Sequence, residues 1–264
     1  MDLATIIGIV LALAGIVGGL LIEGGNIKQI LQPTAAMIVF GGTFGALLVS
    51  FPLDVFILAM KGFIKIVRPD PMKPEAIIEE IIKLATKARK DGVVSLEADA
   101  KNIQDPFFKK AIMMAVDGAD PKELQKLLEM QLSYMEEDEA KIPKVWESAG
   151  GYSPTIGIIG AVMGLIQVMG HLEDIQEVGR GIAVAFVATI YGVAAANIVF
   201  LPASGKLALQ NKKNMVIKEM ILEGVMLIVE GVNPRVIQDK LSIFFGEKTE
   251  EAKPQAAATG EKAA

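Results

Sequence analysis

The sequence predicts an all-α membrane protein. It has four transmembrane helices, a helical cytoplasmic domain between spans 2 and 3, and a cytoplasmic helical extension at the C-terminal end. Apolar residues make up 52% of the chain while 22% are charged, so apolar and polar segments are segregated. Four apolar runs approach or match the length needed to cross a hydrocarbon core of about 30 Å. The region between spans 2 and 3 has helical periodicity and lacks strand-like alternation.

Two spans are expected near the N-terminal end. Leu3 to Ile22 lacks a basic segment before it and a small-residue cleavage site after it, which favours a retained helix. Thr34 to Phe51 follows, with Pro33 at a first helical turn and Gly41 and Gly45 in a G-x-x-x-G pair. Such small residues allow helices to approach closely in lipid.

The polar middle region is predicted to be helical throughout. Leu53 to Arg68 is amphipathic, with basic residues on one face, and is expected to lie along the inner leaflet. After the stop at Gly92, Ser95 is the expected N-cap of the next helix. A long helical pattern then extends from Pro121 to Ser148.

Spans 3 and 4 are predicted to form a closely packed hairpin. They cover Pro154 to Gly170 and Gly181 to Leu201, and neither contains an Asp, Glu, Lys or Arg. Each carries small residues at helical spacing: Gly157, Gly160 and Gly164 in one, and Ala185, Ala188, Gly192 and Ala196 in the other.

The predicted regions follow from these patterns. They are transmembrane helices 1 and 2 (1–51), a helical cytoplasmic domain (52–153), transmembrane helices 3 and 4 (154–202), cytoplasmic helices (203–246) and a disordered tail (247–264). Of the 26 Lys and Arg residues, 15 lie between Pro52 and Ser153 and 9 after Pro202. The positive-inside rule therefore places both termini and the middle region in the cytoplasm, as expected of a multi-pass inner-membrane protein.

The residues that carry most enzymatic chemistry are scarce. The chain has no cysteine and a single histidine, His171, expected to be a solvated turn residue. No phosphate-binding loop is present, and a net charge of −5 gives no reason to expect nucleic acid. We therefore expect no enzyme activity, cofactor or metal.

The spans also lack the ionisable groups that proton relays normally place within the membrane. If ions cross here, a partner must supply the carboxylate. Thr189, Tyr191 and Thr155 offer hydroxyl groups, which alternatively serve only to hydrogen-bond neighbouring helices. Pro154 after Ser153 is typical of a helix start, and Pro202 is a candidate hinge.

Four motifs together resemble the flagellar motor stator MotA/PomA family. They are S-P-T-I-G-I-I-G-A-V-M-G-L (153–165), A-V-A-F-V-A-T-I-Y-G-V-A-A-A-N-I-V-F-L-P (183–202), K-A-R-K-D-G-V-V-S-L-E (87–97) and G-V-N-P-R (231–235). The resemblance runs from residue 1 to about 246. It implies a ring of five copies around two B subunits, each with a single span that carries an aspartate and a part that binds peptidoglycan. Ion flow past that aspartate moves the ring against a rotor protein of the switch complex.

The resemblance also assigns roles to individual residues. It implies that Pro154 and Pro202 couple ion binding to movement. Thr189 lines the ion path, with Tyr191 beside it. Arg89 and Glu97 meet the rotor.

The translocated ion is expected to be H⁺. Sodium-driven relatives carry a threonine seven residues after the third-span proline, where this chain has Ala161. Alanine offers no oxygen to a desolvated sodium ion. Alternatives are a sodium-driven stator or an ExbB/TolQ-like energiser of an outer-membrane process, although that class has three spans. A secondary transporter and a structural scaffold are further alternatives.

Overall fold

The computed structural model describes residues 3–67 and 73–245, and every regular element in these ranges is a helix. Four helical runs are long and apolar enough to cross a membrane: Leu3–Ile22, Ile27–Ser50, Pro121–Gly170 and Ile175–Val229. The prediction of an all-α membrane protein with four spans is therefore confirmed. The expected disordered tail, 247–264, lies outside the described residues, as does Arg68.

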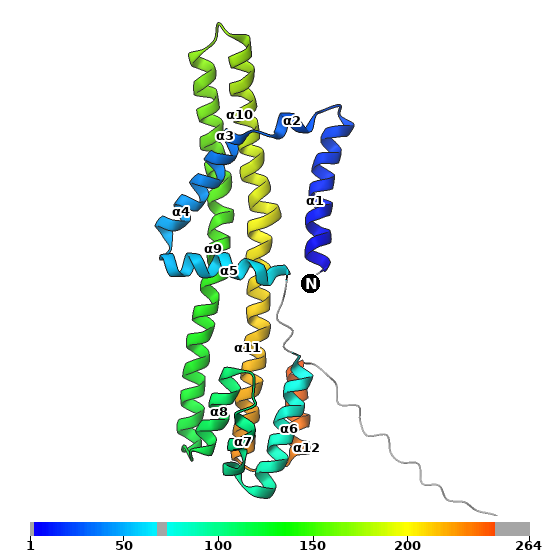
Figure 1. Cartoon of the computed structure of the whole chain (residues 1–264), viewed down its shortest axis with the longest axis vertical. Coiled ribbons are helices and arrows are strands. Elements are labelled where there is room, and N and C mark those ends of the chain that lie inside the picture. Colours follow the sequence, from blue (N-terminus) through cyan, green and yellow to red (C-terminus); the bar gives the residue numbers. More distant parts are fainter. Residues whose placement is uncertain (1–2, 68–72, 246–264) are drawn as a thin grey trace, which may run out of the picture. The chain divides into compact units, whose positions relative to one another are not determined.

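The chain divides into two compact units. Unit 1 comprises Met1–Pro71 and Ser133–Asn214, and unit 2 comprises Met72–Leu132 and Met215–Ala264. Two long helices belong partly to each unit: α9 (Pro121–Gly170) and α11 (Leu201–Val229) (Figure 1).

The N-terminal part of unit 1 contains the first two spans. It consists of α1 (Leu3–Ile22), α2 (Ile27–Ile30), α3 (Pro33–Ala36), η1 (Met37–Gly41) and α4 (Gly42–Ser50), followed by α5 (Leu53–Val67). Elements α3, η1 and α4 form one helical run, in which η1 is a π-helical turn. Pro33 occupies the first turn, as predicted, where its missing N–H has no intrahelical partner to lose.

The other two spans form the hairpin of α9 and α10 (Ile175–Ala194), with their helices side by side in Figure 1. The prediction that Pro154 begins a helix is wrong, because Pro154 lies inside α9. In lipid a proline within a helix is tolerated when neighbouring helices, Ser or Thr side chains or local changes of helix geometry satisfy the freed backbone groups. The π-helical turn η3 (Ala195–Phe200) joins α10 to α11, so the fourth span continues as one helical run to Val229.

Glycines bring α9 and α10 into backbone contact, which confirms the predicted close packing. A Cβ atom built on Gly157 would lie 2.9 Å from the carbonyl oxygen of Ala188, and one built on Gly164 would lie 2.6 Å from that of Gly181. On α10, a Cβ atom on Gly192 would lie 2.6 Å from the carbonyl oxygen of Ser153. Any side chain at these positions would therefore force the helices apart.

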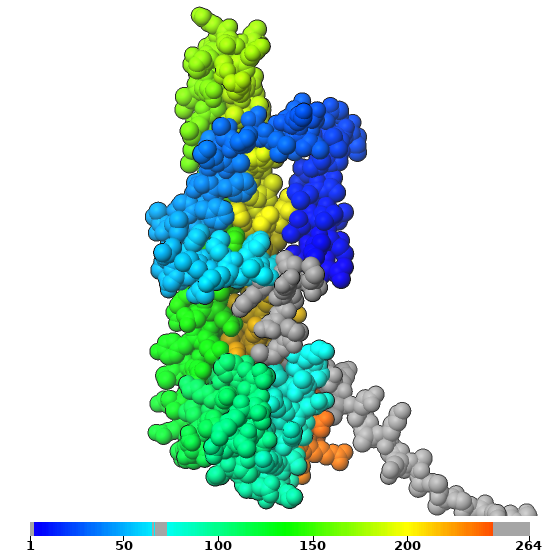
Figure 2. Space-filling model, in the orientation of Figure 1, coloured from blue at the N-terminus to red at the C-terminus, as the bar shows by residue number. Residues whose placement is uncertain are grey.

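Several glycines of the first two spans, unlike the three glycines of α9 and α10 described above, do not lie against another helix of the chain. A Cβ atom on Gly41 or Gly45 would meet nothing within 4 Å, so this predicted G-x-x-x-G pair is not packed within the chain. The same is true of Gly8, Gly15 and Gly19 on α1. No described residue of α1, the dark-blue helix of Figure 2, is buried, although α1 contacts α5 and η3 and its Thr5 hydroxyl accepts a hydrogen bond from the Lys206 ammonium.

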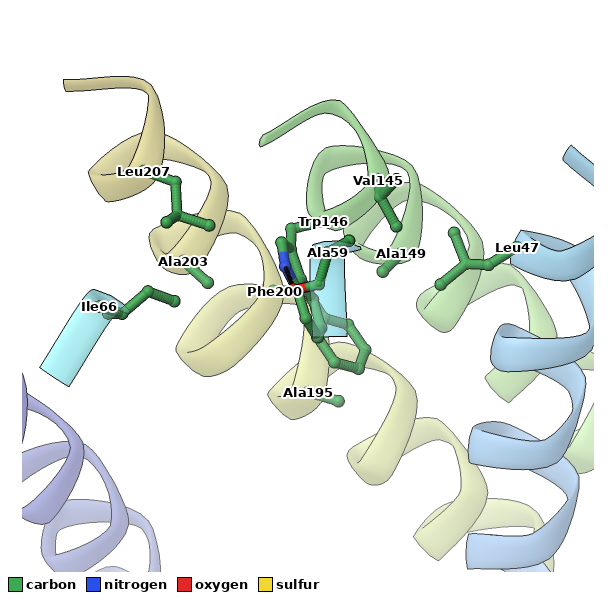
Figure 3. Packing of buried hydrophobic residues seen from close by; sticks show 10 residues of the cluster. All are labelled: Leu47, Ala59, Ile66, Val145, Trp146, Ala149, Ala195, Phe200, Ala203 and Leu207. Atoms are coloured by element: carbon green, nitrogen blue, oxygen red, sulfur yellow. Dashed lines mark hydrogen bonds between the residues drawn. The ribbon is translucent and has the colours of Figure 1, made fainter. Parts of the chain in front are cut away.

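The main core of unit 1 lies where α5 packs against α9 and α11 (Figure 3). Trp146 of α9 is 3% exposed, and its ring centroid lies 4.7 Å from that of Phe63 and 5.8 Å from that of Phe200. Its indole N–H donates to the carbonyl oxygen of Ala59 at 3.2 Å. This tryptophan therefore joins α9 to α5 by packing and a hydrogen bond, and to η3 by packing against Phe200.

Unit 2 contains α6 (Pro74–Asp91), η2 (Val93–Leu96), α7 (Glu97–Ala100), α8 (Pro106–Val116), α12 (Pro234–Ser242) and η4 (Ile243–Phe245). It also includes residues 121–132 of α9 and 215–229 of α11. Its fully buried side chains include Ile81, Phe107, Phe108, Ile112, Leu124, Leu128, Met220, Ile221, Ile237 and Leu241. The prediction of Ser95 as an N-cap is wrong. Its hydroxyl donates to the carbonyl oxygen of Gly92 within the 3₁₀ turn η2, and Leu96 precedes α7.

Gly192→Ala tests the contact between α9 and α10. Because the added methyl group would meet backbone atoms, which cannot rotate away, we expect a loss of about 1–3 kcal/mol in the free energy of unfolding. The measurement is thermal unfolding of the purified protein in detergent. Gly45→Ala, which adds the same methyl group where the chain leaves open space, is the matched control. Equal stability of the two variants would contradict the close approach.

Candidate functional site

The candidate ion path lies along the contact between α9 and α10. The relevant part is the stretch within about one helical turn of Pro154. Ser153 is fully buried, and its hydroxyl donates to the carbonyl oxygen of Gly192 at 3.0 Å. A Cβ atom on Gly192 would lie 3.2 Å from Pro154 Cα, and one on Gly157 would lie 3.5 Å from Thr189 Cα. The structure therefore brings Pro154 and Thr189, both predicted from the sequence, to the same stretch of the hairpin.

The hydroxyl groups near this contact are engaged with their own helices. Thr189 is half-buried, and its hydroxyl donates to the carbonyl oxygen of Ala185 at 3.2 Å. Thr155 is exposed, and its hydroxyl donates to the carbonyl oxygen of Tyr152 at 2.8 Å. Ala161 is half-buried, one turn after Gly157 on the helix face that approaches α10.

Tyr191 contacts the chain segment before the second span. Its hydroxyl donates to the carbonyl oxygen of Ile30 at 2.5 Å and accepts from the N–H of Gln32 at 3.3 Å. These two backbone groups flank the break between α2 and α3, where helical hydrogen bonding stops. The structure therefore gives Tyr191 a positioning contact that the sequence did not indicate, on a different side from Thr189.

Pro202 lies in the first turn of α11, directly after the π-helical turn η3. The N–H of Leu201 donates to the carbonyl oxygen of Ala196, five residues back, instead of to the residue four back. A proline cannot donate and its ring crowds the preceding turn, and a widened turn accommodates both effects. Pro202 itself is exposed. This arrangement is compatible with the predicted hinge.

The predicted rotor-facing pair lies in unit 2. Arg89 is exposed in the last turn of α6, and Glu97 is exposed at the first position of α7. The Glu97 carboxylate accepts from the Lys101 ammonium at 3.2 Å, so its recorded ion pair within the described residues is not with Arg89. Gly92, with φ of +82°, ends α6 between them.

Three functional candidates escaped the sequence reasoning: Ser153, Ser204 and Asn211. The first was interpreted only as a residue before a helix start. The other two donate from α11 to backbone carbonyl oxygens of α9. The available signal was Pro143, a proline inside an otherwise regular helical pattern, which requires outside donors.

The arrangement offers hydroxyl and backbone groups rather than a metal centre. Across residues 3–67 and 73–245, no three His, Asp or Glu side chains gather closely enough to hold a metal ion. The site can therefore orient an ion or a partner helix, and it contains no charged side chain of its own.

Two family models match the chain. Residues 6–92 match the N-terminal region of Motility protein A, and residues 99–220 match the MotA/TolQ/ExbB proton channel family.

Individual relatives match over almost the whole length. Motility protein A of Helicobacter pylori (strain ATCC 700392 / 26695) is 37% identical over 91% of this chain and 94% of its own. Motility protein A of Bacillus subtilis is 31% identical, with 94% and 92% covered, and the chemotaxis protein PomA of Vibrio alginolyticus is 31% identical, with 94% and 96% covered.

Solved structures agree with this result. C. jejuni MotAB matches with a TM-score of 0.88 and 31% identity over 98% of this chain and 100% of that one. The flagellar MotAB stator complex of Bacillus subtilis matches with a TM-score of 0.82 and 30% identity, with 90% and 94% covered. The chain therefore belongs to the Motility protein A family, the channel-forming subunits of the flagellar motor stator.

Proposed function

We propose that the chain forms a homo-oligomeric ring in the inner membrane, with five copies around two B subunits, and that inward proton flow turns this ring against the rotor. Its termini and unit 2 lie in the cytoplasm. The basic residues support this orientation. Of 26 Lys and Arg residues, 15 lie between Pro52 and Ser153 and 9 lie after Pro202, so 24 fall in segments assigned to the cytoplasmic side. The likeness to two solved MotAB complexes supports assembly with a B subunit.

The observation that carries the proposal is the uncharged hairpin. Spans 3 and 4 contain no Asp, Glu, His, Lys or Arg between Pro154 and Gly170 or between Gly181 and Leu201. The hydroxyl of Thr189 already donates to its own helix. A proton crossing the membrane needs a group that titrates, so we infer that the carboxylate belongs to the B subunit. One charge moving through 100 mV supplies about 2.3 kcal/mol.

Protons are favoured over sodium by Ala161. A desolvated sodium ion needs several oxygen ligands, and a methyl group provides none. The small side chain also suits the close approach of α9 and α10 at Gly157 and Gly164.

Work on a rotor is favoured over an ExbB/TolQ-like role. The proton channel family model includes TolQ and ExbB, but the match of residues 6–92 to the Motility protein A N-terminal region is specific to the motility class. Arg89 and Glu97 are exposed and available to a rotor protein of opposite charge pattern. No observation favours a transporter or an enzyme.

The ion is tested by swimming speed. Cells that lack their own stator and produce this chain with its B subunit are expected to swim at speeds independent of external sodium at fixed pH. They should stop when the proton gradient is collapsed. Swimming that follows sodium and persists without a proton gradient would contradict proton coupling, whereas failure to swim despite assembly would contradict the stator role itself.

Pro202→Ala tests the hinge. Because alanine restores a helical N–H next to η3, we expect normal membrane levels and B-subunit association with rotation speed reduced about tenfold or more. The measurement is rotation of tethered cells, with association checked by co-purification. Pro33→Ala, a proline at an ordinary helix start, is the matched control. Loss of folding in Pro202→Ala would instead indicate a purely structural role.

Arg89→Glu tests the rotor contact. Reversing an exposed charge costs little stability, so we expect an assembled complex that conducts ions but generates weak torque. Torque is measured by bead rotation near stall, and conduction by proton uptake of cells producing an unplugged complex. Lys122→Glu reverses another exposed charge of unit 2 and serves as the control. A loss of conduction in Arg89→Glu would assign Arg89 to a different step.

A further inference from the structure

Pro143 interrupts the backbone hydrogen bonds of α9 at a buried position. The proline is buried inside the helix, 11 residues before Pro154. In a regular helix the N–H of residue 143 would donate to the carbonyl oxygen of Glu139. Proline has no N–H, so this acceptor requires a donor from outside the helix, since an unsatisfied buried carbonyl is costly.

Asn211 supplies that donor. Its side-chain amide, on α11, donates to the carbonyl oxygen of Glu139 at 2.6 Å. Ser204, two helical turns earlier on α11, is 9% exposed, and its hydroxyl donates to the carbonyl oxygen of Pro143 itself at 2.8 Å. Two side chains of one helix thus bind the two carbonyl groups at either end of the interrupted turn.

The surrounding packing holds this arrangement in place. Ile142 contacts Gly62 of α5, where a Cβ atom would lie 3.0 Å from its Cγ2 atom. Trp146, one turn further along α9, donates to Ala59 of the same helix. Leu207, between Ser204 and Asn211, is 3% exposed in the same core (Figure 3).

We propose that Asn211 and Ser204 form a proline clamp, which fixes the axial register of α11 against α9. Sliding by one residue moves a helix about 1.5 Å along its axis, which would break both hydrogen bonds and leave the Glu139 carbonyl without the donor that replaces the missing N–H. Pro143 makes the clamp necessary, because any other residue would satisfy Glu139 from within α9.

The clamp has a consequence for the proposed function, on which this step rests. Pro154 and Pro202 lie on the two helices that the clamp joins: Pro154 is inside α9, 11 residues after Pro143, and Pro202 is in the first turn of α11. An axial displacement of α9 at Pro154 therefore moves α11 by the same distance, because the clamp keeps the register of the two helices fixed. Asn211 and Ser204 are therefore positioning residues for torque, and they do not touch the ion.

The register is measured first, without reference to motility. The chain has no cysteine, so Ala140→Cys with Ala208→Cys, two exposed positions beside the clamp, allows spin labelling of the full chain in lipid nanodiscs. We expect one narrow distance distribution, which broadens or shifts in Asn211→Asp. Aspartate keeps the size of asparagine and removes the N–H donors.

A double-mutant cycle assigns the effect to Pro143. Asn211→Ala is expected to lower the folded-to-unfolded ratio about fivefold, as for the loss of one hydrogen bond. In a Pro143→Ala background, where the N–H of residue 143 serves Glu139, the same change should lower the ratio less than twofold. Asn197→Ala is the control, because Asn197 on the same helical run donates to Val193 of its own helix.

Motor torque gives the functional readout. Asn211→Ala should reduce bead torque at unchanged membrane levels, and Pro143→Ala should restore it. Equal effects of Asn211→Ala in both backgrounds, or an unchanged distance distribution in Asn211→Asp, would overturn the clamp. If the register changes but torque does not, the clamp is structural only and the positioning role is overturned. If no variant swims, including the parent, the failure belongs to the proposed stator function.

Discussion

Buried backbone groups must find hydrogen-bond partners without water, both inside the membrane and in the packed helices beyond it, and much of this structure depends on that constraint. It allows prolines inside helices where another helix supplies a donor or where a change of helix geometry accommodates the missing N–H. Pro143 meets a side-chain amide of α11, and Pro202 follows a π-helical turn in which the hydrogen bonds are redistributed. The same constraint places Ser153, a buried hydroxyl, against the carbonyl oxygen of Gly192. The polar side chains of Asn211 and Ser153 therefore form hydrogen bonds with backbone carbonyl oxygens.

Close packing of α9 and α10 has a different origin. Hydrophobicity does not draw helices together in lipid, because the lipid tails are equally apolar. Small residues do so by letting backbones approach, and Gly157, Gly164 and Gly192 each leave no room for a Cβ atom. This contact leaves the other faces of the hairpin covered with exposed apolar side chains, among them Ile158, Val162 and Ile166. Those faces are accessible to a partner helix without opening the hairpin.

The sequence predicted the helical class, the four spans and the small-residue contact well, because length, apolarity and spacing determine them. It predicted helix ends poorly. Pro154 was interpreted as a start because a proline usually begins a helix, yet α9 runs through it, next to the hydrogen bond from Ser153 to Gly192 of α10. Ser95 has the composition of an N-cap, but the 3₁₀ turn after Gly92 engages its hydroxyl differently. The contacts of Tyr191 and Asn211 join residues 72 to 161 positions apart, and no local pattern records them.

The weak burial of α1 bears on how the protein assembles. This helix contacts α5 and η3, and Thr5 accepts a hydrogen bond from Lys206, but none of its described residues is buried, so it packs within the chain less than the other spans do. Contacts with other molecules of the assembly can therefore add to its stability, and their contribution depends on concentration. We therefore expect the first span to complete its packing on assembly of the subunits, after the contacts among spans 2 to 4 have formed within one chain.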